Sequence, residues 1–152
     1  MRVALLSPRG PLYRHRSGIF GKSLRYAPLT LSTLAALVPP ELDIELALFD
    51  EGIEEVPCDL QADLVGISAI TGTANRSYEL AGQLRNRGIK VVLGGVHPTL
   101  CPDEAQQHAD CVVTGYAEDT WPQLLRDFKA GDLKPRYTQD SNLDLGGRPD
   151  RA

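Results

Sequence analysis

The sequence has 152 residues, which suits one folded domain, because a domain usually holds about 100–200 residues. A hydrophobic fraction of 42% and a charged fraction of 24% are typical of a globular protein with its own core. The net charge of −4 argues against a general nucleic-acid binder, and no segment approaches the roughly 18 apolar residues of a membrane span. We therefore expect one domain with neither nucleic acid nor a membrane as its partner.

The cysteines and the N-terminus indicate a cytoplasmic location. Cys58, Cys101 and Cys111 are odd in number and widely spaced, so they predict neither a disulfide framework nor a zinc site. The first apolar stretch ends at Pro8 and Arg9 and is too short for a signal peptide. We expect a cytoplasmic protein and assign no residue as a metal ligand.

Three strands are predicted in the first half of the chain, at residues 3–6, 43–50 and 64–70. Their short apolar runs end at turn residues, as in the buried strands of parallel sheets. A loop rich in Gly, Pro and Arg covers residues 8–27, and a helix covers residues 28–38. Pro28 suits the first position of that helix, where its missing N–H has no intrahelical partner to lose.

In the second half, helices and strands alternate. We predict helices over residues 74–87, from 102 or 103 to 108, and over 118–129. Between them, residues 91–93 and 111–114 form two further strands. The pattern therefore repeats a strand followed by a helix.

This alternation predicts an α/β fold. Strand–helix–strand units imply right-handed crossovers and a parallel sheet covered on both faces. Five strands favour a flavodoxin-like (Rossmann-like) three-layer fold with the order 2-1-3-4-5. We assign residues 1–133 to this domain, and residues 134–152, where the pattern ends, to a linker or tail. Ligands of such sheets bind outside the carboxyl ends of the strands, near the first and third strands.

The loops expected at that edge contain many glycines and small hydroxyl residues. A single glycine is explained by the needs of a turn, but glycines at neighbouring strand ends also let a ligand approach the backbone, since they have no Cβ. The group as a whole predicts a broad, bulky ligand lying across the edge. The candidate contacts are Ser68, Ile70, Thr71, Gly72, Thr73, Gly94, Gly95, Val96, His97, Gly115 and Tyr116.

Few residues suggest catalysis. The histidines are His15, His97 and His108, and no Ser-His-Asp pattern, carboxylate pair or metal-ligand spacing accompanies them. The acidic residues that a phosphoacceptor receiver domain needs after its first and third strands are absent, and no G-x-G-x-x-G fingerprint occurs. A binding or carrier module fits this inventory better than a complete enzyme.

Four stretches carry a resemblance to a known family: residues 27–38 (APLTLSTLAALV), 63–73 (DLVGISAITGT), 93–104 (LGGVHPTLCPDE) and 109–125 (ADCVVTGYAEDTWPQLL). In this order, the sequence resembles the cobalamin-binding domains that precede the catalytic barrel in many radical S-adenosylmethionine enzymes. The resemblance implies that the cofactor is cobalamin.

Cobalamin domains carry three short motifs, and the sequence is similar to two of them. Residues 68–70 match S-x-L with Ile in place of Leu, and Gly94 with Gly95 match G-G. The resemblance implies that Ser68 lines the slot of the dimethylbenzimidazole tail and that the glycines let the tail pass. In the D-x-H-x-x-G motif, Tyr13 stands in place of the Asp that would orient His15. We therefore do not assign His15 as a cobalt ligand.

The resemblance also implies a partner. The C-x-x-x-C-x-x-C motif that holds an iron–sulfur cluster is absent, so this chain lacks the complete catalytic machinery. We expect a radical S-adenosylmethionine domain in cis or in trans, which would hold the cluster and S-adenosylmethionine. The full enzyme would carry out methyl transfer or related chemistry.

Two alternatives remain open at this point. One is a free-standing cobalamin carrier. The other is a flavodoxin-like carrier or sensor that binds a flavin or nucleotide at the same edge. Residues 71–73 (TGT) and the basic first loop support this alternative.

Overall fold

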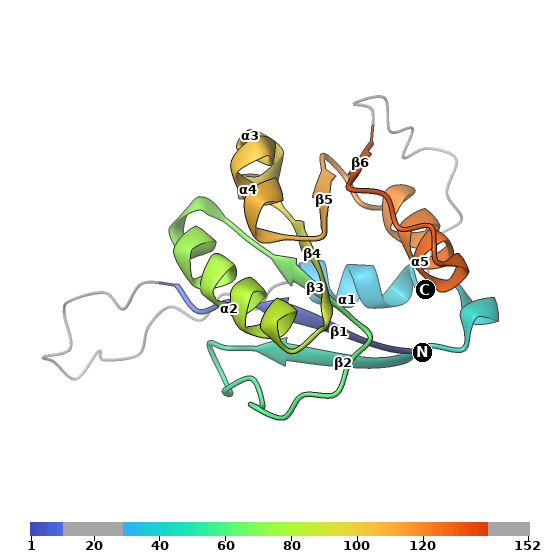
Figure 1. Cartoon of the computed structure of the whole chain (residues 1–152), viewed down its shortest axis with the longest axis horizontal. Coiled ribbons are helices and arrows are strands. Elements are labelled where there is room, and N and C mark those ends of the chain that lie inside the picture. Colours follow the sequence, from blue (N-terminus) through green and yellow to red (C-terminus); the bar gives the residue numbers. More distant parts are fainter. Residues whose placement is uncertain (11–28, 140–152) are drawn as a thin grey trace, which may run out of the picture.

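The computed structural model describes residues 1–10 and 29–139, and its centre is a parallel sheet (Figure 1). Its strand order is β2-β1-β3-β4-β5-β6. The strands are β1 (Arg2–Ser7), β2 (Glu45–Asp50), β3 (Leu64–Ser68), β4 (Lys90–Gly94), β5 (Cys111–Thr114) and β6 (Arg136–Thr138). The flavodoxin-like arrangement is confirmed, but the predicted number of five strands is wrong, because β6 extends the sheet beyond β5.

Strand β6 escaped prediction because it is short and has one buried side chain, that of Tyr137. The Tyr137 hydroxyl donates a hydrogen bond to Oδ2 of Asp127 at 2.7 Å, which fixes the strand to the last helix. A three-residue strand with one buried side chain is too short to show an apolar run or a clear alternation in the sequence. The strand lies within residues 134–152, the segment that we assigned to a linker, and the domain boundary at residue 133 stays a prediction.

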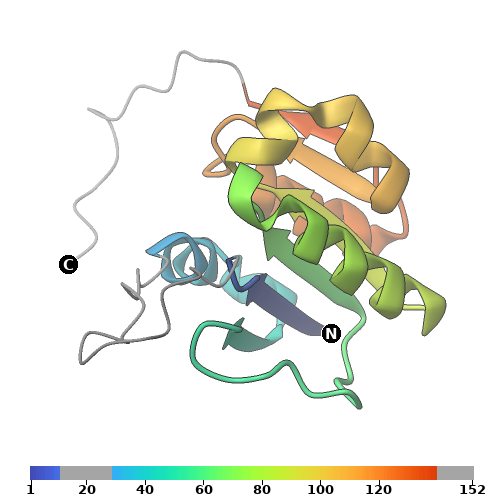
Figure 2. The ribbon, with the colours of Figure 1, turned by 90° about the vertical axis from the view of Figure 1, so that its left-hand side faces the viewer.

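The helices cover both faces of the sheet (Figure 2). They are α1 (Leu29–Ala36), α2 (Ala74–Asn86), α3 (Val96–Leu100), α4 (Pro102–His108) and α5 (Thr120–Ala130), with short 3-10 turns η1 (Pro40–Leu42) and η2 (Thr71–Thr73). Helices α1 and α5 pack on one face, and α2 and α4 on the other. Helix α3 occupies a segment that we predicted as loop, because a five-residue helix is too short to show an apolar period.

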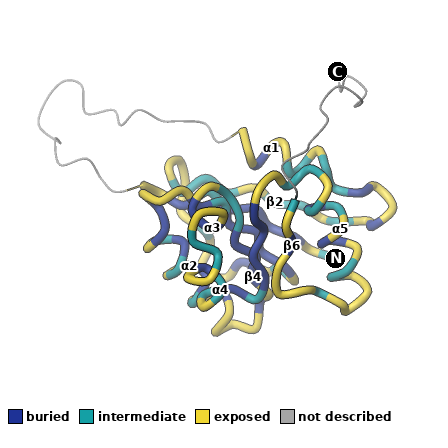
Figure 3. Tube along the Cα trace, turned by 90° about the horizontal axis from the view of Figure 1, so that it is seen from above, coloured by how far each residue is buried: buried dark blue, intermediate teal, exposed yellow. Residues whose placement is uncertain are grey.

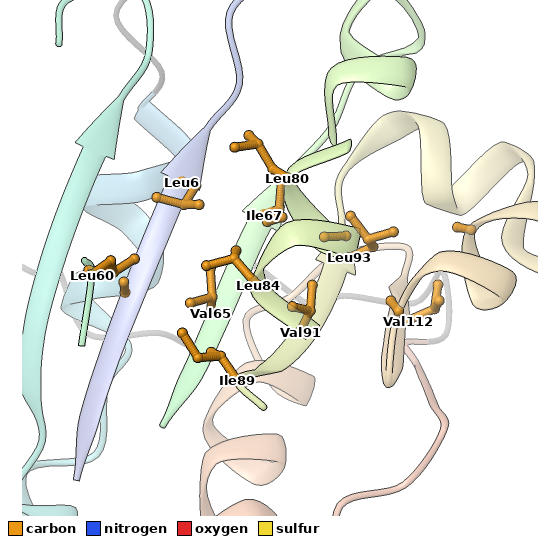
Figure 4. Packing of buried hydrophobic residues seen from close by; sticks show 14 residues of the cluster. Leu6, Leu60, Val65, Ile67, Leu80, Leu84, Ile89, Val91, Leu93 and Val112 are labelled. Atoms are coloured by element: carbon orange, nitrogen blue, oxygen red, sulfur yellow. The ribbon is translucent and has the colours of Figure 1, made fainter. Parts of the chain in front are cut away.

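Alternating side chains of the strands build a separate core on each face. Figure 4 shows the core under α2, where Val65, Val91 and Leu93 of the strands meet Leu80 and Leu84 of the helix. The core under α1 and α5 contains Val3, Leu5, Leu64, Val92, Trp121, Leu124 and Leu125. Successive residues of a strand point to opposite faces, so Val91 and Val92 lie in different cores.

The middle of the sheet is buried, and exposed residues gather at its ends and on the outer sides of the helices (Figure 3). In β3, the first four residues are buried and Ser68 is half-buried. Gly94, the last residue of the neighbouring strand β4, is half-buried too, so the ends of β3 and β4 reach the surface at the same edge. Within residues 1–10 and 29–139, no helix combines the length and apolar character needed to cross a membrane.

Candidate functional site

A cavity of about 690 Å³ lies between α1 and the carboxyl-terminal half of the sheet. Helix α1 and the turn after it contribute Leu29, Thr30, Thr33, Leu34 and Leu37. The strands contribute Leu5, Gly66, Ser68, Val92, Gly94 and Val113, and the segments after β4 and β5 contribute Gly95, Val96, Thr99, Leu100, Gly115, Tyr116, Glu118 and Trp121. Most of these side chains are apolar, so the cavity suits a ligand with a large apolar part.

Two rows of side-chain positions form the floor of the cavity. In the first, Leu5, Gly66 and Val92 lie side by side on β1, β3 and β4. In the second, two residues nearer the edge, Ser68 lies beside Gly94. The small residues in both rows leave space between the sheet and α1.

Gly66 is a site residue that sequence reasoning missed. A Cβ atom at this position would lie 2.9 Å from Leu5 Cδ2 and 3.5 Å from Trp121 Cη2. Any side chain there would therefore occupy the floor between Leu5 and Trp121. The available signal was an isolated glycine inside a strand, which often marks the close approach of a ligand or another backbone.

Gly95 turns the chain from β4 into α3. Its φ of 102° is strained for other residues, and a Cβ would lie 2.7 Å from the Ala69 carbonyl oxygen. The same carbonyl accepts a hydrogen bond from the His97 N–H at 3.1 Å, and the Ala69 N–H donates to the Gly94 carbonyl at 2.8 Å. These contacts join the ends of β3 and β4 beside the cavity.

Thr99 links two of the loops around the cavity and was also missed. Its hydroxyl donates to the Gly95 carbonyl oxygen at 2.8 Å and accepts from the Gly115 N–H at 3.0 Å. Gly115 has a φ of 78°, and a Cβ there would lie 2.8 Å from the Gln139 carbonyl oxygen. The loop after β5 is therefore held between α3 and the residue that follows β6.

The predicted contacts fall into two groups. Six line the cavity, namely Ser68, Gly94, Gly95, Val96, Gly115 and Tyr116. Ile70, Thr71 and Gly72 are exposed at the same edge but are not among the lining residues. Thr73 is buried, and its hydroxyl bonds to the backbone N–H and C=O of Ile70, both at 3.1 Å, which closes the turn after β3.

His97 is buried on the side of α3 that faces α2, and it does not line the cavity. Its Nε2 lies 2.9 Å from the hydroxyl of Tyr78 and 3.4 Å from Oε1 of Glu104. Tyr78 donates to that same carboxylate oxygen at 2.9 Å and stacks on His108 with ring centroids 4.0 Å apart. His108 is half-buried as a result.

The hydrogen bonds of this cluster shift the pKa values of Tyr78 and Glu104 in opposite directions. Burial and the bond to Glu104 raise the pKa of the Tyr78 hydroxyl, and hydrogen bonds from Tyr78 and His97 lower the pKa of the Glu104 carboxyl. His97, Cys101 and Glu104 bring possible metal-ligating atoms within 4.8 Å of one another. Because Tyr78 already bridges His97 and Glu104, the cluster acts in this structure as a polar connection between α2, α3 and α4.

The motif around His15, with Tyr13 and Gly18, lies outside the described residues, as does most of the basic first loop.

Comparisons with known proteins identify the family. The model of the B12 binding domain family matches residues 27–125, more than half of the chain and nearly all of the cavity. The chain is 44% identical over 110 residues to a bacteriochlorophyllide d C-8(2)-methyltransferase of Chlorobaculum tepidum, with 72% of this chain and 24% of the relative aligned. It is 33% identical over 117 residues to the C-12(1)-methyltransferase of the same organism, with 76% of this chain and 25% of the relative aligned.

An uncharacterized methyltransferase of Pyrococcus horikoshii is 30% identical over 115 residues, which cover 68% of this chain and 25% of the relative. The chain thus spans about a quarter of the length of the curated relatives it matches. The family match and the first of these relatives support cobalamin as the cofactor. The chain belongs to the B12 binding domain family.

Proposed function

We propose that this chain is the cobalamin-binding part of a methyl-transferring radical S-adenosylmethionine enzyme, with the cofactor's nucleotide tail in the cavity under α1. The observation that carries the proposal is the glycine-lined floor of this cavity, where Gly66 and Gly94 leave space beside Ser68. The flavin or nucleotide alternative is not favoured, because the matching family binds B12.

The residues fit the cofactor in two respects. Cobalamin has a nucleotide tail that ends in an apolar dimethylbenzimidazole, and the cavity is lined mainly by apolar side chains. Its wide corrin ring would lie over the edge of the sheet, where five large apolar residues are exposed. These are Leu29, Ile70, Val96, Leu100 and Tyr116. Exposed apolar groups gathered in one region mark binding surfaces.

The protein's own part in the reaction would be to bind, orient and shield. Gly94 and Gly95 would let the tail pass, Ser68 would contact it, and α1 would cover it. Bound cobalamin supplies a cobalt atom that can carry a methyl group. The names of the relatives, all methyltransferases, support methyl transfer as the reaction of the full enzyme. The partner domain, in cis or in trans, and the cytoplasmic location stay predictions.

The test is retention of cobalamin by the purified chain. After incubation with hydroxocobalamin and desalting, we expect the visible spectrum of the cofactor to remain with the protein. Gly94→Trp should abolish retention, because the new ring would fill the cavity. Gly82→Trp is the matched control, since Gly82 lies on α2 with no atom within 4 Å of its Cβ position. Equal retention by the wild type and Gly94→Trp would reject this cavity as the tail site.

A further inference from the structure

We infer that the inner end of the cavity selects among cobamides by their tail base, and that it favours an apolar benzimidazole over a purine such as adenine. The inference rests on the proposed function, because it assumes that the tail enters this cavity. It adds a specificity for the tail base, because few polar groups of the cavity are free to form a hydrogen bond with a ligand.

The inner end of the cavity is hydrocarbon. Its floor is the row of Leu5, Gly66 and Val92, all buried, and Leu34 and Trp121 face it from α1 and α5. The indole N–H of Trp121 is the one polar group of these side chains, and it donates to the Leu34 carbonyl oxygen at 3.1 Å. Among residues 1–10 and 29–139, a ligand atom at the inner end therefore meets no side-chain group that is free to donate a hydrogen bond.

Nearer the edge, two of the threonine hydroxyls that line the cavity already form hydrogen bonds within the protein. Thr99 donates to Gly95 and accepts from Gly115, and Thr33 donates to the Leu29 carbonyl at 3.0 Å. The Ser68 hydroxyl, beside Gly94 in the second row, has no hydrogen-bond partner among the described residues. Thr30, which is exposed, and Glu118, which follows β5, line the open side. In the described part of the chain, Ser68 thus supplies the one free hydroxyl next to the inner end.

This arrangement matches one base better than the other. Dimethylbenzimidazole has one ring nitrogen able to accept a hydrogen bond, and its methyl groups suit a hydrocarbon wall. Adenine adds an amino group and further ring nitrogens, and these would lose water without gaining partners. We expect the adenine-tailed cobamide to bind at least about tenfold more weakly, which equals about 1.4 kcal/mol. One buried polar group without a partner is enough for a penalty of this size.

The experiment compares dissociation constants of cobalamin and of the adenine-tailed cobamide for the full chain by titration calorimetry. The variant is Val92→Thr, which places a hydroxyl in the inner row at nearly constant shape. Its matched control is Val91→Thr, the same change on the same strand but in the opposite core, under α2. Circular dichroism confirms that both variants fold, and the wild-type comparison stands without them.

We expect the preference for cobalamin to be at least about tenfold in the wild type, to fall several-fold in Val92→Thr, and to stay unchanged in Val91→Thr. Equal or tighter binding of the adenine-tailed cobamide by the wild type would overturn the inference and leave the proposed function standing. Equal loss of the preference in both valine variants would also overturn it. If neither cobamide binds, the proposed function itself is wrong.

Discussion

The indole N–H of Trp121 on α5 donates a hydrogen bond to the carbonyl oxygen of Leu34 on α1, 3.1 Å away, and both side chains line the cavity. Within α1, Leu31 is the one buried residue. The Leu34 carbonyl, near the end of α1, also accepts from the Leu37 N–H at 3.2 Å, and the additional bond from Trp121 fixes the helix over the sheet.

Replacement of Trp121 by Phe should therefore loosen α1. We expect the free energy of unfolding to fall by about 1 kcal/mol through the lost hydrogen bond, with a further loss from the smaller ring. Cobalamin affinity should fall by about fivefold, because the helix no longer closes the cavity firmly. Urea denaturation and titration calorimetry measure the two effects. Unchanged unfolding and binding in Trp121→Phe would show that the bond does not position α1.

Gly66→Leu should block binding while the fold survives. The new side chain starts 2.9 Å from Leu5 Cδ2, a flexible methyl that can move, so overpacking should cost about 1–3 kcal/mol of stability. The remaining volume of the side chain lies in the cavity, and cobalamin affinity should fall at least about tenfold. Gly82→Leu on α2 is the control and should bind as the wild type does. A Gly66→Leu protein that binds normally would contradict the assignment of the cavity floor.

Gly95→Ala should be more damaging than Gly88→Ala. Both glycines have positive φ, 102° and 79°, so each change carries a conformational cost of about 1–2 kcal/mol. Only at Gly95 does the Cβ also meet backbone, with the Ala69 oxygen 2.7 Å away, while at Gly88 no atom lies within 4 Å. Thermal unfolding should show the larger loss for Gly95→Ala, together with weaker cobalamin binding. Equal melting temperatures of the two variants would mean that the ends of β3 and β4 adjust freely.

The ion pair of Glu51 and Arg76 predicts a pH dependence of stability. Burial alone would raise the pKa of Glu51, but hydrogen bonds from the Arg76 side chain and the Arg9 N–H outweigh it and lower the pKa below its ordinary value of 4.5. A carboxyl whose pKa is lower in the folded state stabilises the fold fully above the unfolded pKa, and this contribution is lost as the pH falls through the folded pKa.

The stability difference between the wild type and Glu51→Gln should therefore be constant near neutral pH and should shrink below about pH 4.5. Urea denaturation at a series of pH values measures it. Glu55→Gln, an exposed position in the same loop, serves as the control for removal of one negative charge. If the stability difference between the wild type and Glu51→Gln grew as the pH fell, the pKa of Glu51 would not be lowered in the folded state, and this prediction would be wrong.

Much of the fold could be predicted from the sequence because the sheet is buried on both faces. The short apolar run within Leu64–Ser68 predicts a buried central strand, and the helical period of α5 identifies the buried face of that helix. Strand β6 could not be predicted, since Tyr137 is its one buried residue and a single apolar position gives no pattern. Helix α3 could not be found either, because five residues give no period.

The site was harder to predict than the fold. Ser68 and Gly94 stand at strand ends, where topology alone places ligands. Gly66 stands inside a strand, and only the packing of Leu5 and Trp121 around it reveals that its missing side chain leaves space. His97 follows two glycines and was predicted as a ligand contact, but α3 turns its ring towards Tyr78. One-dimensional patterns locate an edge of a sheet, whereas the direction of each side chain depends on neighbours distant in the chain.

We propose that cobalamin occupies the cavity under α1, and the fluorescence of Trp121 reports on that cavity. Trp121 is the single tryptophan of the sequence, lines the cavity and is 2% exposed. Titration with hydroxocobalamin, corrected for absorption by a tryptophan solution of equal strength, should quench its emission with one saturable phase, and Gly66→Leu should remove that phase. Absence of saturable quenching in the wild type, or equal quenching in Gly66→Leu, would contradict the claim.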